Sequence, residues 1–231
     1  MTTFVTVPGA WHGAWAVESF NDALRGLGYK ALGLTMPSLA GVDRRGIPAD
    51  VQAVSRALDS LSDDVVLVGH SYAGVVITQA GMHPSVRRLV YLAAFMPDLG
   101  QTASSLMSGE GVRNSGEATL QPVIRRSVDL DMVELNPDLA GAALYGDCPA
   151  SEQAAAISQL KPHVRAVFGQ VPQMVAWKTK PSTFVICNQD RAIPPSLQRE
   201  MAQRATTRVE LKSGHSPFMS MPGTLADALV G

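Results

Sequence analysis

The chain of 231 residues has few of the features that mark several large classes of protein. It contains only two cysteines, Cys148 and Cys187, too few and too far apart for a zinc cluster or a disulfide framework. No apolar stretch reaches the roughly 18 residues of a membrane span. A formal net charge of −1 gives no electrostatic reason to expect a nucleic acid or membrane partner. The phosphate-binding patterns G-x-x-x-x-G-K and G-x-G-x-x-G are absent, and we expect no metal and no cofactor.

The low cysteine count and the chain length indicate a cellular compartment and a domain organisation. The chain enters a strand-like run at once, without a basic leader, and its two cysteines lie in different regions. These features indicate a reducing cytoplasm without a disulfide, although a pair between Cys148 and Cys187 stays open. The length suits one α/β domain and is too short for two full domains. Oligomeric state leaves no sequence signal, so a homodimer stays open.

Strand-like and helix-like segments alternate over most of the chain. Strands are expected near residues 4–7, 29–34, 65–69, 88–93, 182–187 and 207–212. Helices are expected near residues 15–26, 47–61, 72–81, 196–205 and 220–229. This alternation predicts an α/β fold with a mainly parallel six-stranded sheet and helices on both of its faces.

The alternation stops between residues 100 and 178, which we interpret as a lid inserted into a core of residues 1–99 and 179–231. The insertion is polar and small at first and is expected to be helical over 122–130 and 151–160. Its apolar side chains are candidates for lining a substrate pocket, although for any single one of them core packing is the more common role. We expect Phe168, Met174 and Trp177 to contact substrate, with Met107 and Met132 as further candidates.

One short motif follows a buried strand directly. The apolar run Val65–Val68 leads into Gly69-His70-Ser71-Tyr72-Ala73-Gly74, after which a helix is expected. The arrangement resembles the nucleophile elbow of α/β-hydrolases, in which a strained turn presents a serine hydroxyl above the sheet. The usual pattern is G-x-S-x-G, and here Ala73 stands at the second glycine position with Gly74 after it. Such a string is weak evidence unless catalytic partners follow at the right places.

Two partners do follow. Asp190 comes after the strand-like run 183–187, and His215 comes after the run 208–212. Ser71, Asp190 and His215 thus occur in the order nucleophile, acid and base, each past the C-terminal end of an expected strand. A serine needs an imidazole to take its proton, and the imidazole needs a carboxylate to fix its tautomer. Singly, Asp190 and His215 would be read as turn residues, but jointly they predict a catalytic triad.

Other residues compete for these roles. Asp98 follows the strand-like run 89–93 and is the rival acid, because some hydrolases of this fold place the carboxylate there. Among the histidines, His70 is expected to point away from the serine, His83 lies in a helix-ending turn, and His163 lies in the lid. We therefore favour Asp190 and His215.

The loop after the first strand is expected to complete the catalytic site. Acyl transfer forms an oxyanion that needs two preorganised backbone N–H donors. We expect them from Tyr72, just after the nucleophile, and from Ala10 in the loop Pro8-Gly9-Ala10-Trp11. The alternative is that glycine here merely permits a tight turn. Trp11 is the aromatic residue of this loop that we expect to touch substrate.

At several blocks the chain resembles the plant methyl esterase and hydroxynitrile lyase group of α/β-hydrolases and its bacterial relatives. The resemblance is carried by Pro8–Trp15, Gly69–Gly74, Leu92–Asp98, Leu144–Pro149, Leu160–Pro162, Cys187–Asp190, Ile193–Pro194 and His215. It implies Ser71 as nucleophile, His215 as base and Asp190 as its partner. It also implies Ala10 and Tyr72 as the oxyanion donors, and a small-molecule ester as substrate.

Three departures from the family separate the possible chemistries. The lyases carry a lysine immediately after the catalytic histidine, where this chain has Ser216, and a threonine where it has Gly9. Pro8 replaces a histidine found in many relatives. Without the lysine and the threonine, an esterase of small-to-medium hydrophobic esters is favoured over a lyase. The intact triad argues against a ligand-binding receptor, and a cofactor-free perhydrolase stays open. Methyl, aryl and pyrethroid-like esters and lactones all remain candidate substrates.

Overall fold

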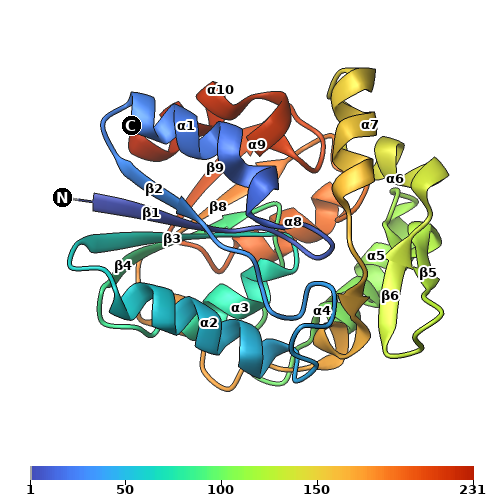
Figure 1. The fold of residues 1–231 in the computed structure, drawn as a ribbon, viewed down its shortest axis with the longest axis horizontal. Helices are drawn as coiled ribbons and strands as arrows, with labels where there is room; N and C mark the ends of the chain where they lie inside the picture. The colour runs from blue at the N-terminus through green and yellow to red at the C-terminus, as the bar shows by residue number, and fades with distance from the viewer. Residues whose placement is uncertain (1) are drawn as a thin grey trace.

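The computed structural model describes residues 2–231, which form a central six-stranded sheet in the order β2-β1-β3-β4-β8-β9 (Figure 1). All neighbouring strands of this sheet are parallel. The strands are β1 (Thr2–Val7), β2 (Lys30–Gly33), β3 (Asp64–His70), β4 (Val86–Leu92), β8 (Ser182–Cys187) and β9 (Thr207–Leu211). The predicted α/β fold is confirmed, and so are the positions of all six expected strands.

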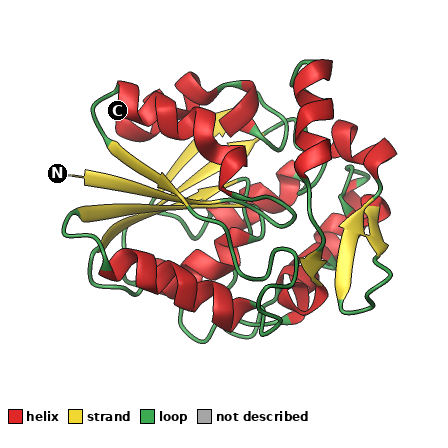
Figure 2. Ribbon diagram, in the orientation of Figure 1, coloured by secondary structure: helices red, strands yellow, loops and turns green. Residues whose placement is uncertain are grey.

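Helices cover both faces of the sheet (Figure 2). One face carries α1 (Glu18–Gly26), preceded by the 3-10 turn η1 (Ala14–Val17), together with α9 (Pro217–Ser220) and α10 (Pro222–Val230). The other carries α2 (Ile47–Asp59), α3 (Ala73–Ala80) and α8 (Pro195–Ala202). Successive residues of β3 serve opposite faces, because side chains alternate along a strand. Val65 and Leu67 pack toward α2 and α3, whereas Val66 and Val68 pack toward α1 and α10.

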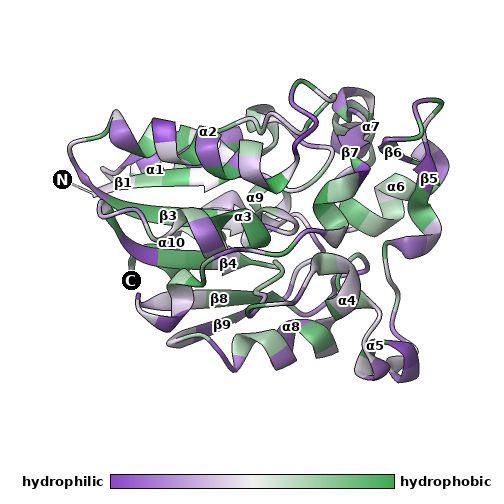
Figure 3. Ribbon diagram, turned by 90° about the horizontal axis from the view of Figure 1, so that it is seen from below, coloured by the Kyte–Doolittle hydropathy of each residue, from purple (hydrophilic) through white to green (hydrophobic). Residues whose placement is uncertain are grey.

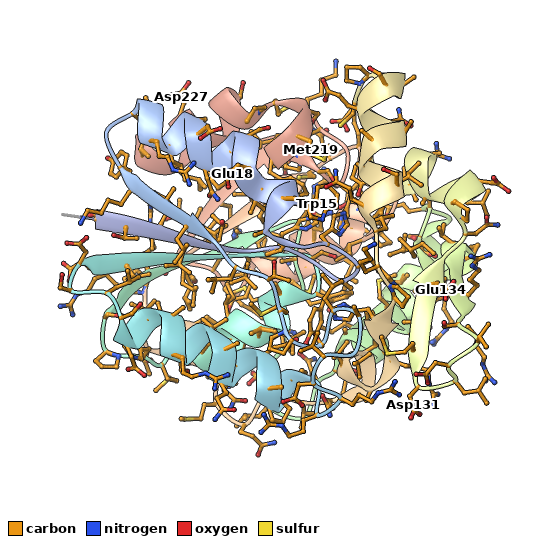
Figure 4. The ribbon with its side chains drawn as sticks, in the orientation of Figure 1. Trp15, Glu18, Asp131, Glu134, Met219 and Asp227 are labelled. Atoms are coloured by element: carbon orange, nitrogen blue, oxygen red, sulfur yellow. The ribbon has the colours of Figure 1, made fainter. Side chains whose placement is uncertain are left out.

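Hydropathy follows this layering. In Figure 3 the strands of the large sheet are mostly hydrophobic, and hydrophilic residues gather on the outer helical surfaces. Trp15 and Met219 lie near each other in Figure 4, at the N-terminal end of α1. Both side chains pack against the two apolar layers. Within residues 2–231, every helix is too short or too polar to span a lipid bilayer. Cys148 and Cys187 are both buried, with free thiols.

Most of residues 100–169 lie beyond the ends of the parallel strands, at the right of Figure 1, whereas residues 176–178 pack against α3. Residues 100–178 form α4 (Ala103–Met107), α5 (Glu110–Ser115), η2 (Gln121–Val123), β5 (Ile124–Arg126), β6 (Met132–Leu135), α6 (Pro137–Leu144), α7 (Ala150–Gln159), β7 (His163–Val164), η3 (Arg165–Gly169) and η4 (Ala176–Lys178). Strands β5, β6 and β7 make a small antiparallel sheet. Asp131 and Glu134 mark the outer edge of its hairpin in Figure 4. The expected helix near 151–160 is confirmed as α7.

The helix expected over 122–130 is wrong. Pro122 lies in a single 3-10 turn, and β5 then pairs with β6, so that Ile124 lies opposite Leu135. Val128 and Leu130 are fully or largely exposed at the hairpin turn. The apolar spacing of this stretch fits a helix and a hairpin about equally, and pairing with a distant strand decided the outcome.

Gly74 is the position where α3 comes closest to the neighbouring chain. A Cβ atom there would lie 2.0 Å from the carbonyl oxygen of Phe95 and 2.9 Å from the Cβ of Ala94. The close approach anticipated around the serine therefore falls on Gly74, while Ala73 is accommodated. The backbone of Phe95 or that of α3 would have to move to admit a methyl group.

We expect Gly74→Ala to lower the free energy of unfolding by about 3 kcal/mol or more, at or above the upper end of ordinary overpacking costs. Gly26→Ala is the matched control, because no atom lies within 4 Å of a Cβ placed there. That control should be neutral or stabilising by up to about 1 kcal/mol. Urea unfolding of both variants measures the difference, and equal stabilities would contradict the close approach.

Candidate active site

Ser71 occupies a strained turn between β3 and α3. Its φ angle is 54°, in the left-handed region that non-glycine residues rarely adopt. The turn is held by its backbone: the Ser71 N–H donates to the carbonyl of Leu92 at 3.2 Å, and the Ser71 carbonyl accepts from the N–H of Phe95 at 3.1 Å. This is the geometry that a nucleophile elbow requires.

The first loop lies directly against this turn. A Cβ atom on Gly9 would lie 2.8 Å from the Cβ of Ser71, so only glycine permits the contact. Ala10 and Tyr72 line the same cavity as Ser71. Among the hydrogen bonds within residues 2–231, none uses the N–H group of Ala10 or Tyr72. Both groups are therefore available to a ligand in that cavity.

His215 and Asp190 form a buried pair at the ends of β9 and β8. The Nδ1 of His215 lies 2.7 Å from Oδ2 of Asp190, and both side chains are almost completely buried. The second carboxylate oxygen of Asp190 accepts from the N–H groups of Ala192 (2.7 Å) and Ile193 (3.1 Å). Gln198 Nε2 also donates to Oδ2, at 2.8 Å. An ionised carboxylate accepts all four hydrogen bonds, which hold it in one orientation.

The loop that carries His215 is held from two sides. His70 Nε2 lies 2.9 Å from the carbonyl oxygen of His215, and the two imidazole rings are 4.5 Å apart. On the other side, the N–H of Gly214 donates to Asp147 Oδ2 at 2.7 Å. Because β3, β8 and β9 are parallel strands of one sheet, their carboxyl ends bring Ser71, Asp190 and His215 to the same edge.

Asp98, the rival acid, has a different partner. Its Oδ1 lies 2.5 Å from Nζ of Lys178, and this hydrogen bond lowers the pKa of the Asp98 carboxyl. Its side chain is about one-third exposed, at 37%. The carboxylate that His215 contacts is therefore that of Asp190, as the chain order indicated.

A cavity of about 710 Å³ opens above Ser71. Its walls come from both parts of the chain: residues 10–11, 71–72 and 192–193 of the core, and residues within 103–108, 120–133 and 164–169. Trp11 and Phe168 line it and stack on each other with ring centroids 5.5 Å apart. Met107, Phe95 and Leu120 line it as well.

Two of the expected substrate contacts lie elsewhere. Met174 is 46% exposed, outside the cavity wall. Trp177 also lies outside the wall, where its Nε1 donates to the carbonyl of Pro97 at 2.9 Å and its ring lies beneath Lys178. Met132 is buried against Gly41 rather than in the cavity. Residue type indicated an apolar lining, but the direction of each side chain depends on the local chain path.

Sequence reasoning missed several residues that position the site. Gln198 holds the acid and Asp147 holds the loop of the base, each through one side chain. Asp147 lies in the block Leu144–Pro149, but the resemblance gave it no role. No group of three or more His, Cys, Asp or Glu side chains within residues 2–231 is arranged to hold a metal ion. Gln198 follows Asp190 by eight positions, and that closeness was its only signal in the sequence. Asp147 is 67 positions from Gly214, so no spacing pointed to its contact with that loop.

Three buried histidines surround the site in their neutral form. Burial lowers the pKa of His12 to about 4 and that of His163 to about 3. Burial, together with His215, lowers the pKa of His70 well below its usual value. Burial acts in the opposite direction on Asp50, whose pKa is raised. Protonation of these imidazoles is therefore disfavoured in the folded state.

We expect the free energy of unfolding to fall as pH drops from about 6.5 toward 4. In that window the unfolded chain binds protons on histidines that the folded chain keeps neutral, at about 1.4 kcal/mol per pH unit for each group. Asp50 offsets part of this loss, because its raised pKa favours folding as pH falls. Urea unfolding at pH 7.5 and 5.0 measures the slope, and His163→Gln should reduce it by about one proton. A pH-independent stability would contradict the assignment.

Comparison with known proteins places the chain in a family. Residues 4–228 match the Alpha/beta hydrolase family, and the chain belongs to it. It is 29% identical to the alpha/beta hydrolase nvfD of Aspergillus novofumigatus, over 94% of this chain and 91% of that protein. It is 25% identical to methylesterase 1 of Arabidopsis thaliana over 97% and 93% of the two chains, and 26% identical to an alpha-hydroxynitrile lyase of the same plant over 98% and 95%.

Solved structures agree on the fold. A pyrethroid hydrolase from Sphingobium faniae JZ-2 superposes with a TM-score of 0.86, covering 99% of this chain and 95% of its own, at 20% identity. The predicted membership of the α/β-hydrolases is therefore confirmed, and methylesterases and a hydroxynitrile lyase are among the relatives of this chain.

Proposed function

We propose that the protein is a serine carboxylesterase that hydrolyses small-to-medium hydrophobic carboxylic esters. The observation that carries this proposal is the buried hydrogen bond between His215 and Asp190 at the sheet edge where Ser71 occupies its strained turn. Relatives named as esterases and hydrolases support the same class of enzyme. Ser71 is the nucleophile, His215 the general base and Asp190 its carboxylate partner.

The hydrogen bond to Asp190 determines which nitrogen of His215 is basic. With Nδ1–H donating to the carboxylate, Nε2 carries the lone pair that takes the Ser71 proton. Ser71 Oγ then attacks the ester carbonyl carbon, and the tetrahedral oxyanion accepts from the N–H groups of Ala10 and Tyr72. As the C–O bond breaks, the protonated imidazole gives its proton to the leaving alcohol.

Water completes the turnover. His215 removes a proton from a water molecule that attacks the acyl-enzyme. As the second tetrahedral intermediate collapses, the acyl C–O bond breaks and the protonated His215 returns the proton to Ser71 Oγ, which releases the carboxylic acid and restores the free hydroxyl. The ester, one water molecule, Ser71 and His215 account for every bond that forms or breaks in the two half-reactions.

The cavity supports an apolar substrate. Its volume of about 710 Å³ lies within the range of about 300–1,000 Å³ for small-molecule sites. Trp11, Phe168 and Met107 offer aromatic and thioether surface close to Ser71. Residues 100–178 supply much of the wall, and we propose that they act as a lid over the ester.

Hydrolysis of p-nitrophenyl esters of increasing acyl length tests this function, together with labelling by a fluorophosphonate. The proposal predicts Ser71-dependent turnover and a single covalent adduct on the peptide that contains Ser71. Absence of turnover with every ester, or an adduct elsewhere, would overturn it.

A hydroxynitrile lyase is the second candidate because one relative bears that name. Two features disfavour it. Ser216, which follows His215, is fully buried and carries no charge to hold departing cyanide. Gly9 leaves no room for the threonine of the lyases, since a Cβ there would collide with Ser71. Release of cyanide from mandelonitrile at a rate comparable with ester hydrolysis would favour the lyase.

A further inference from the structure

A chain of buried hydrogen bonds connects the loop of Ala10 to the side chain of Tyr72. The Trp11 N–H donates to Nδ1 of His163 at 3.3 Å. His163 Nε2 lies 3.0 Å from the hydroxyl of Ser38, which donates to Oδ2 of Asp50 at 2.5 Å. The phenol of Tyr72 donates to the same carboxylate oxygen at 2.8 Å. All five residues are buried.

Proton positions along this chain are set by its two ends. A backbone N–H can only donate, so Nδ1 of His163 accepts and its Nε2 carries the hydrogen. That hydrogen is donated to Ser38 Oγ, which leaves the Ser38 hydroxyl proton for Asp50. The order of donors and acceptors is therefore consistent from Trp11 to the carboxylate, and burial keeps His163 neutral by lowering its pKa to about 3.

The peptide group between Ala10 and Trp11 is held at both of its polar atoms. The hydrogen-bond chain just described holds its N–H, and His12 holds its carbonyl oxygen. Nδ1 of His12 lies 2.7 Å from the carbonyl oxygen of Ala10, and its Nε2 lies 2.6 Å from the hydroxyl of Tyr145. The peptide is thus bonded through both its C=O and its N–H. This restraint acts on a strained segment, because Trp11 has a φ angle of 67°.

Burial of the Asp50 carboxylate costs free energy, because no positive charge in the described part of the chain compensates it. Its exposed fraction is 0%, and within residues 2–231 its hydrogen-bond partners are Ser38 and Tyr72, with no cation among them. Burial without a counter-charge raises the pKa of its carboxyl. The ester mechanism does not use Asp50, since Asp190 is the partner of His215. A buried carboxylate without an ion pair needs another role.

We propose that His163, Ser38 and Asp50 are positioning residues that hold the Trp11 peptide and the Tyr72 side chain, and thereby the two oxyanion donors, in register. The inference rests on the proposed esterase function. The donors at Ala10 and Tyr72 come from segments 62 positions apart in the chain. This network connects the two segments, from the backbone N–H of Trp11 to the phenol of Tyr72, through the side chains of His163, Ser38 and Asp50. A shift of the donors weakens binding of the oxyanion more than binding of the uncharged ester.

The structure offers variants that separate these effects. Tyr72→Phe removes the hydroxyl and keeps both the ring and the backbone N–H. His163→Leu removes both bonds of the imidazole, whereas His163→Gln can still accept from Trp11 and donate to Ser38. Backbone bonds from Ala40 N to Pro162 O (2.7 Å) and from Val164 N to Ser38 O (3.1 Å) keep the segments attached in each variant.

Tyr91→Phe is the matched control. The Tyr91 hydroxyl is also buried and bonded, at 2.9 Å from Oγ1 of Thr78, but it lies in the core away from the cavity. For each variant, kcat and KM are measured with a p-nitrophenyl ester. Inhibition is measured with a trifluoromethyl ketone, which forms an oxyanion adduct with the serine, and with the matching methyl ketone, which remains uncharged.

We expect kcat to fall about 10-fold in Tyr72→Phe and up to about 100-fold in His163→Leu, with KM changed less than about threefold. Inhibition by the trifluoromethyl ketone should weaken in parallel, while inhibition by the methyl ketone stays unchanged. His163→Gln should recover most of the rate, and Tyr91→Phe should match the wild type. If His163→Leu fails to fold, Tyr72→Phe and His163→Gln still decide the question.

Wild-type kcat in both Tyr72→Phe and His163→Leu would overturn the network's role, and so would a loss confined to KM. An equal loss in Tyr91→Phe would also overturn it, because the effect would then be general destabilisation. A wild-type protein without Ser71-dependent hydrolysis would instead overturn the proposed function, so the two failures are distinguishable.

Discussion

Replacing Ser71 with alanine should reduce kcat for p-nitrophenyl ester hydrolysis by about 10⁶-fold, the scale seen when a serine hydrolase loses its nucleophile. The hydroxyl oxygen is the atom that forms the acyl-enzyme, and neither water nor His215 can replace it at a useful rate. Steady-state hydrolysis by the wild type and the variant, at matched protein concentration, measures the loss.

The fold should survive this change. The contacts that hold the turn use the backbone of Ser71, including the bonds to Leu92 and Phe95, and alanine retains the Cβ atom. Thermal unfolding should therefore be nearly unchanged. Ser104→Ala is the matched control, because Ser104 lines the same cavity without a place in the mechanism. Comparable hydrolysis by Ser71→Ala and the wild type would remove Ser71 as the nucleophile.

Asp190→Asn should lower kcat by about 10⁴-fold, as loss of the carboxylate does in other triads. The reason lies in the four donors that converge on Asp190. If the new NH₂ group takes the position of Oδ2, it meets His215 and Gln198 and forces the wrong tautomer of the imidazole. If it takes the position of Oδ1, it meets the N–H groups of Ala192 and Ile193.

Asp98→Asn provides the control for this prediction. Asp98 pairs with Lys178, and within residues 2–231 it makes no hydrogen bond to His215. Asp98→Asn should therefore keep activity within about twofold of the wild type. Stopped-flow or steady-state hydrolysis of the same ester measures both variants. Full activity in Asp190→Asn with a collapse in Asp98→Asn would transfer the acid role to Asp98.

The parallel sheet was predictable because each of its strands has a clear local sequence pattern. Val65–Val68 is apolar throughout, as expected of a strand covered on both faces, and it is followed at once by the turn at Gly69. The helix over residues 122–130 failed for the opposite reason. Its replacement, β5, exists because it pairs with β6, and residue spacing within one segment does not encode that partner.

The reacting residues could be predicted, whereas most of their supports could not. Asp190 and His215 follow strands in the order that the chemistry requires, so order and placement reinforced each other. Gln198 and Asp50 lie within helices, where a polar residue usually faces water. Their burial depends on which groups the fold brings opposite them, and sequence spacing carries no record of those distant partners.

Met174 and Trp177 show the same limit for the cavity. Both have the size and character of pocket residues, and both lie outside the wall because the chain turns them toward solvent or toward Pro97. Phe168 was predicted for the same reasons and Trp11 for its place in the oxyanion loop, and both line the cavity. Composition identifies candidates for a pocket, and only the path of the backbone selects among them.

Because the cavity wall comes from two parts of the chain, the substrate preference of such an enzyme can change separately from its catalytic residues. The reacting groups at Ser71, Asp190 and His215 all come from the framework of the parallel sheet, while much of the surface that would meet the ester comes from residues 103–169. Substitutions in that stretch can alter which ester is accepted without retuning the proton transfers. A library confined to Met107, Leu120, Val133 and Phe168 is therefore the shortest route to new selectivity, and natural divergence can follow the same route.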